Sequence, residues 1–189
     1  MASELTQFTD INLTTSFAGY FANQLTLAGW QIYWQGTNTL SGTGSLGTVT
    51  IVPEMPNEPE YIVMPPRPNK SQQEVVTPVF AAHLLEQPTD EYRYGLGDNI
   101  FRVHATLILE GFTVDKAQHM VFATYIRTFF RPEFRIPIWD WEGNPTTPAL
   151  IDNINTYVDH RRVDRLEFPD LPQPVRYYLN AAIDLIYFD

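Results

Sequence analysis

The chain contains no cysteine, which excludes disulfide frameworks, thiolate nucleophiles and zinc sites built on cysteine. Positive charge is scarce: 12 lysines and arginines stand against 22 acidic residues, so the net charge is −10, and the longest basic run is HRRVDR at 160–165. Non-specific nucleic-acid binding needs cations that neutralise phosphates. We therefore do not expect the chain to bind DNA or RNA tightly.

Sequence signatures of membrane insertion, export and common catalytic loops are missing too. No stretch approaches the roughly 20 consecutive apolar residues of a membrane helix, and segment 1–16 lacks the pattern of a signal peptide. We expect no membrane contact and no export by a signal peptide. There is no Gly-x-Ser-x-Gly motif, and the glycine-rich segment 36–47 lacks the Lys-Ser/Thr ending of a phosphate-binding loop.

Apolar material is plentiful. The composition is 44% hydrophobic over 189 residues, which is enough to bury the core of one domain. We expect a single α+β domain over 1–189, in which a mostly antiparallel sheet packs against an N-terminal helix and a central amphipathic helix. Long loop insertions are expected at about 36–59, 65–74 and 131–160.

Apolar residues at helical spacing predict three helices. The first covers 10–29, where Gly29 suits the left-handed position that ends a helix. The second covers 113–130, with Thr113 as its cap. The third, shorter helix lies within 147–160. The central helix is expected to bury one stripe of side chains: Val114, Ala117, Val121, Phe122, Tyr125, Ile126 and Phe129.

Alternating or continuous apolar runs predict the strands. Two long ones, 75–86 and 100–111, are separated by a polar segment containing glycine, which predicts an antiparallel hairpin with a long exposed loop. Pro78 indicates an edge or a bulge in the first of them. The other predicted strands cover 30–35, 48–52, 61–64, 134–141, 161–168 and 175–188.

The segment HATLILEGFTVDKAQH, 104–119, begins and ends in histidine. Strand alternation places His104 away from the apolar face, and helical spacing places His119 on the solvent face, so the two rings should not converge. We interpret the segment as the elbow between a buried strand and a buried helix, and expect no metal or cofactor. An Asp115–His119 metal pair, or His83 facing His104 across the hairpin, remains an open alternative.

The motif WDWEG, 139–143, is the best candidate for enzymatic or carbohydrate-binding chemistry. Aromatic platforms beside paired carboxylates are typical of sugar-cleaving sites. The alternative is a strand end in which Asp140 and Glu142 are solvated on one face and Trp139 and Trp141 lie on the other.

The segment NIFRVHATLILEGFTVDKAQHMVFATYIRTFF, 99–130, resembles the tail terminator proteins of long-tailed bacteriophages and the related neck proteins. Family members show a similar strand, a turn and an amphipathic helix packed across the sheet. The segment AGWQIYW, 28–34, after the N-terminal helix fits the same pattern. Together with the N-terminal helix, the two stretches cover 57 of the 189 residues.

The resemblance implies a structural virion protein with no enzymatic activity, assembled in the host cytoplasm. It would form a hexameric ring that caps the tail tube, stops its growth and meets the head-side neck proteins. Another neck or baseplate ring is the alternative within this class. Six chains would carry 6 × −10 = −60, and an acidic channel lets DNA pass without binding. The arginines expected to fix register between subunits are Arg93, Arg131, Arg135 and Arg165.

Overall fold

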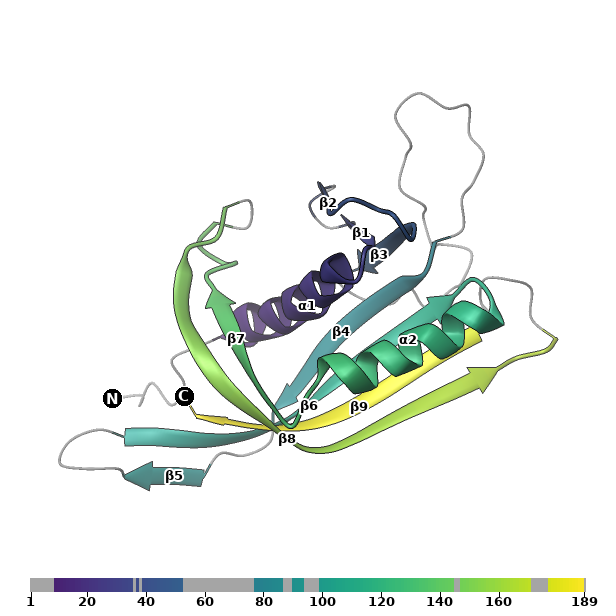
Figure 1. The fold of residues 1–189 in the computed structure, drawn as a ribbon. Helices are drawn as coiled ribbons and strands as arrows, with labels where there is room; N and C mark the ends of the chain where they lie inside the picture. The colour runs from purple at the N-terminus through teal and green to yellow at the C-terminus, as the bar shows by residue number, and fades with distance from the viewer. Residues whose placement is uncertain are drawn as a thin grey trace.

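Nine strands form one curved sheet that wraps around two helices (Figure 1). The computed structural model of the chain describes residues 9–35, 37, 39–52, 77–86, 90–93, 99–144, 147–170 and 177–188. The strands are β1 (Gln31–Trp34), β2 (Thr39–Ser41), β3 (Thr48–Val52), β4 (Val79–Glu86), β5 (Asp90–Arg93), β6 (Asn99–Thr113), β7 (Glu133–Trp139), β8 (Leu150–Glu167) and β9 (Tyr177–Phe188).

Neighbouring strands follow the order β2-β1-β3-β4-β6-β9-β8-β7, and β5 pairs with the first residues of β6. The β1–β3 and β3–β4 pairs are parallel, and the other pairs are antiparallel. The expected α+β class, with a mostly antiparallel sheet and an N-terminal helix, is therefore confirmed. The β5–β6 pairing extends beyond the part of the sheet that the helices cover, as an arm (Figure 1).

Helix α1 (Asp10–Leu27) lies in the hollow of the sheet, between β4 on one side and β7 on the other (Figure 1). The Thr9 side chain caps its first turn, and Gly29 follows its end with φ 101°, as the sequence predicts. Its buried stripe recurs every four residues, and each of these side chains is at most 1% exposed: Leu13, Phe17, Phe21 and Leu25.

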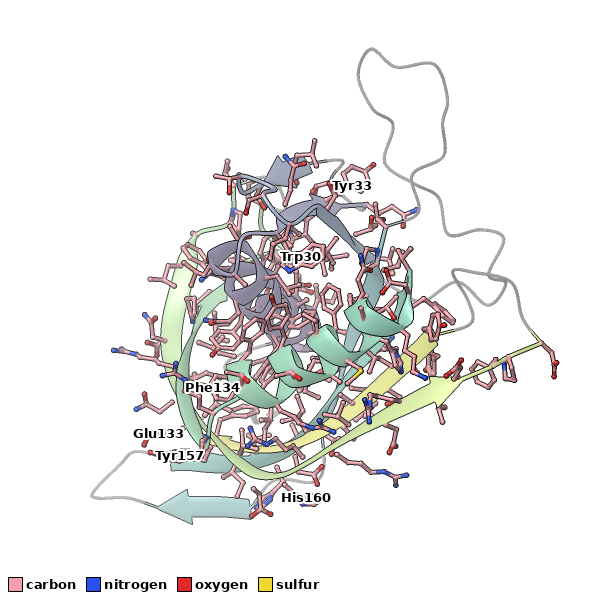
Figure 2. All side chains as sticks on the ribbon, turned by 45° about the vertical axis from the view of Figure 1, so that its right-hand side comes forward. Trp30, Tyr33, Glu133, Phe134, Tyr157 and His160 are labelled. Carbon is pink, nitrogen blue, oxygen red and sulfur yellow. The ribbon has the colours of Figure 1, made fainter. Side chains whose placement is uncertain are left out.

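Helix α2 (Lys116–Phe129) packs on the same face of the sheet as α1, because the ring of Phe80 contacts both Phe21 and Phe122. The centroids of the Trp30 and Phe122 rings lie 5.1 Å apart, and Trp30 points into the space between the two helices (Figure 2). A single apolar core therefore joins both helices to the sheet.

The predicted start and buried stripe of α2 are partly wrong. Thr113 is the last residue of β6, and the Asp115 carboxylate caps the helix by accepting a hydrogen bond from the Gln118 N–H at 2.8 Å. Ala117 and Val121 are exposed, and the buried positions include His119. The contacts of α2 with β6, β8 and β9 determine which side of the helix faces the core. Hydropathy alone does not predict a histidine at a buried position. The buried residues of the helix are His119, Phe122, Ala123 and Ile126.

The helix predicted within 147–160 is wrong, because residues 150–160 belong to β8 (Leu150–Glu167). Ile154 and Thr156 are buried in strand alternation, and β7 and β9 hydrogen-bond to the segment from both sides. The strand predicted at 161–168 is the continuation of β8 after a register shift between Val158 and His160. Most of the expected insertion at 131–160 is therefore part of the sheet.

Smaller differences concern the loops. The expected loop 36–47 contains β2, and the expected hairpin loop contains β5. Pro78 marks neither an edge nor a bulge: it precedes β4, a strand between β3 and β6, and its carbonyl accepts the Thr50 N–H at 2.8 Å. The predicted strand 61–64 and the expected insertion 65–74 lie outside the described residues.

Candidate functional site

The WDWEG motif forms the turn that joins β7 to β8 at one end of the molecule. β7 ends at Trp139, so the predicted alternation of side chains through 142 does not occur. Asp140 Oδ1 accepts the Gly143 N–H at 2.9 Å, and Asn12 Oδ1 accepts the Trp141 N–H at 2.7 Å. The Asp140 carboxylate thus shapes a turn that helix α1 anchors.

Two further hydrogen bonds to side chains of α1 support the same turn. The N–H of Trp139 donates to the Ser16 hydroxyl at 3.1 Å, and the Glu142 N–H donates to Asn12 Oδ1 at 3.3 Å. Both Ser16 and Asn12 are buried, at 2% and 4% exposure. These two side chains were not identified from the sequence, because their partners are backbone groups more than 100 positions away.

The four arginines expected to fix register lie on different elements. Arg93 ends β5 on the arm, opposite Asn99, and Arg131 is exposed directly after α2. Arg135 is exposed on β7, whereas Arg165 lies on β8 opposite Leu179, on the side that faces α2. The structure does not bring the four together in one site.

The sheet has an outward side and a core side along β7 and β8. Glu133 and Tyr157 are paired across these strands and point outward, whereas Phe134 points into the core (Figure 2). His160 also lies on the outer side, beyond the register shift in β8 (Figure 2).

The histidine-bounded segment is an elbow, as expected, but His119 is not solvated. Its side chain is 5% exposed, and Nδ1 lies 3.3 Å from the Thr113 hydroxyl. Glu110 accepts a hydrogen bond from the Tyr178 hydroxyl at 2.7 Å, and burial together with this carboxylate raises the pKa of Tyr178. His119 and Glu110 therefore each have a partner within the fold.

The two metal alternatives find no support in the described part of the chain, where no cluster of three or more potential ligands occurs. Asp115 caps α2, and its partner in the proposed pair, His119, is turned toward the core. His83 lies opposite Ile108, so the hairpin register does not place it against His104.

His119 makes folding stability depend on pH. Burial lowers its pKa below the ordinary 6.5, the Arg165 charge lowers it further and Glu167 opposes the shift. Between the lowered pKa and 6.5 the unfolded chain binds the proton more readily, so stability is complete above this window and is lost as pH falls through it. We expect His119→Gln to lose less stability than the wild type between about pH 7.5 and about pH 5.5 in urea titrations.

His160 gives the matched control for this pH prediction, since its side chain is exposed. His160→Gln should show the same pH dependence as the wild type. An unchanged pH dependence in His119→Gln would contradict the assignment of the effect to the buried ring.

Arg161 is a further structurally important side chain that the sequence does not identify. Its guanidinium Nη1 donates to the carbonyl oxygens of Arg127 and Phe130, at the C-terminal end of α2. Cations stabilise this end of a helix because its last carbonyls lack partners within the helix. Arg161 therefore ties α2 to β8.

We expect Arg161→Met to lower the free energy of unfolding by about 1–3 kcal/mol, because it leaves these carbonyls without their charged donor. The neighbouring Arg162 is the control. It points to the other side of β8 and pairs with the half-buried Asp164 at 2.8 Å, and the Arg162 side chain itself is 72% exposed, so Arg162→Met should cost about 0–1 kcal/mol. Chemical denaturation of both variants measures the difference, and equal losses would contradict the role of Arg161.

Comparison with models of known protein families finds no match for this chain, and comparison with characterised proteins finds none either. Among the described residues, no helix is long and apolar enough to cross a membrane.

Proposed function

We propose that this protein is a non-enzymatic structural subunit of the tail–neck junction of a long-tailed bacteriophage, where a ring of six copies ends the tail tube. The proposal rests on the family resemblance of segments 28–34 and 99–130, and on how the described surface distributes its apolar side chains. A ring subunit must meet two neighbours, the tube and the head-side neck, and so needs several separate contact surfaces.

The observation that carries the proposal is a set of twelve large apolar side chains that are each at least 39% exposed. They occur at several places around one core: at both ends of α1, on α2, on β2 and in the loop after it, on β4, and along β8 and just beyond its end. Neighbouring exposed apolar side chains, such as Met120 with Val121 and Leu150 with Ile151, favour contact surfaces, whereas a small-molecule site needs one concave pocket. The twelve are Ile11, Leu27, Leu40, Leu46, Leu85, Met120, Val121, Leu150, Ile151, Tyr157, Leu166 and Phe168.

The WDWEG turn fits the same role. Its backbone is held by α1, and the Asp140 carboxylate is occupied by the Gly143 N–H. A turn fixed in this way presents a rigid surface at the end of the β7–β8 hairpin. The arm formed by β5 and β6 supplies a second projecting element (Figure 1).

The mass of the purified chain tests the ring. Six chains of 21.7 kDa give about 130 kDa by light scattering, and the protein should co-purify with tail tubes of its own phage. A monomer at micromolar concentration that does not bind tubes would overturn the proposal.

The assembled protein is expected to show no measurable affinity for duplex DNA, even at low salt. The net charge of −10 per chain repels phosphates, and this repulsion is strongest when few salt ions screen it. Electrophoretic mobility of a labelled duplex checks this. A retarded band at low salt that disappears as salt is raised would contradict an acidic DNA passage.

A further inference from the structure

The outward side of α2 carries an apolar strip, here called the helix patch: Ala117, Met120, Val121 and Thr124. Met120 is 53% exposed and Val121 is 41% exposed. The Thr124 hydroxyl donates to the Met120 carbonyl at 3.0 Å, so its methyl group is left to face solvent. Neighbouring exposed apolar side chains on an ordered helix favour contact with another protein surface.

Positive charge accompanies the helix patch. α2 contains no acidic residue, although the chain as a whole has a net charge of −10. Its charged side chains are Arg127 and Lys116, and Lys116 pairs with Glu167 of β8 at 3.9 Å. Arg127 and Arg131 are exposed at the C-terminal end of the helix patch. A partner should therefore offer apolar side chains accompanied by carboxylates.

Such a surface exists on this chain, at the opposite end of the β7–β8 hairpin from α2. It is here called the tip patch: Ile11, Leu150 and Ile151, with the carboxylates Asp10, Glu142 and Asp152. The three apolar side chains are 56%, 49% and 39% exposed, and the three acidic residues are exposed too.

The tip patch is one surface because α1 anchors the turn. Asn12 binds the N–H groups of Trp141 and Glu142, which places the first turn of α1 beside the hairpin end, and Leu150 pairs with Trp139 across the strands. Neither α1 nor segment 136–160 contains a lysine or arginine. The two patches are therefore both apolar and opposite in charge.

We propose that the helix patch of one copy binds the tip patch of the next copy. The contact joins two different surfaces, so a pair of copies keeps one free helix patch and one free tip patch at its two ends, and the chain of contacts closes into a ring when the rotation between copies allows it. The inference rests on the proposed ring and names the contact that builds it.

Two variants each remove one side of the contact. Met120→Glu places a charge in the helix patch, and Ile151→Glu adds a carboxylate to the apolar part of the tip patch. Each variant alone should be a monomer of 21.7 kDa, with its thermal unfolding unchanged because both positions are exposed. Light scattering on the wild type and both variants measures the loss.

Mixing the two variants gives the decisive result. Met120→Glu keeps its tip patch and Ile151→Glu keeps its helix patch, so an equimolar mixture should form a complex of two chains that cannot grow further. Formation of this pair also shows that both variants are folded. Asn23→Glu is the control: Asn23 is exposed on α1 and lies outside both patches and outside the twelve apolar residues, so its assembly should equal that of the wild type.

The possible outcomes distinguish a failure of the proposed contact from a failure of the proposed ring. If the wild type assembles and both variants assemble equally, or if the mixture remains monomeric, the contact is wrong and the ring stands. If the variants keep the wild-type mass and only Met120→Glu loses tube binding, the helix patch meets the tube, and the contact is again wrong. A monomeric wild type overturns both.

Discussion

Replacing Phe122 with alanine is expected to lower the free energy of unfolding by about 3–5 kcal/mol, the largest loss that we expect from a single truncation here. Phe122 is fully buried, and its ring contacts those of Trp30, Phe80 and Tyr125 at centroid distances of 5.1, 4.9 and 5.8 Å. Alanine would leave a cavity where α2 meets β1 and β4. Urea denaturation measures the loss.

Thr124 is the control for Phe122, since it lies two positions further along the same helix and is exposed. Thr124→Ala should change the free energy of unfolding by about 0.5 kcal/mol or less. A loss of less than about 1 kcal/mol for Phe122→Ala would mean that the two helices do not share one core.

The elements that the sequence predicts well are those whose own periodicity agrees with their contacts. Helix α1 buries Phe17, Phe21 and Leu25 at the spacing seen in the sequence, and Gly29 ends it where expected. The β4–β6 pairing also follows directly, because both strands are long and apolar. Local pattern and tertiary packing coincide in these segments.

Segment 150–160 shows why the third helix was mispredicted. Its apolar residues recur at helical spacing, but the buried ones in the structure, Ile154 and Thr156, alternate as in a strand. Pairing with β7, and from Thr156 onward with β9, supplies hydrogen bonds that the local pattern does not reveal. The strand at 150–160 can be predicted only when the strands on either side of it are known.

Prediction of the candidate site from the sequence is limited in the same way, because the site depends on contacts between segments that are far apart in the chain. Trp139 and Asp140 belong to a motif that is distinctive in the sequence, whereas Asn12 and Arg161 carry ordinary polar side chains with no sequence signature. Their partners are backbone N–H and carbonyl groups, which every residue has, so only the fold shows which ones they meet. His119 was placed on the wrong face for a related reason: its burial depends on Thr113 and on the Tyr177 ring, 5.8 Å away.

Gly111→Val is expected to destabilise the protein by about 1–3 kcal/mol or more, although valine is a better strand former than glycine. Gly111 lies opposite Phe80 in the β4–β6 pair, and a Cβ atom there would overlap the Phe80 ring and come within 2.9 Å of the Val79 carbonyl oxygen. The carbonyl belongs to the backbone of a central strand, so the collision cannot be relieved by rotating one side chain.

Gly19→Ala is the control for Gly111→Val. The opposite result is expected, so the comparison tests whether a steric clash causes the loss at Gly111. It lies within α1, and a Cβ atom added there has nothing within 4 Å. Gly19→Ala should raise the free energy of unfolding by about 0.5–1 kcal/mol, because alanine favours the helix and restricts the unfolded chain. Opposite shifts of the urea midpoint in the two variants would show that Gly111 is required by the ring of Phe80. A stabilising Gly111→Val would mean that β4 and β6 do not pair in this register, and the placement of α2 over the sheet would have to be revised with it.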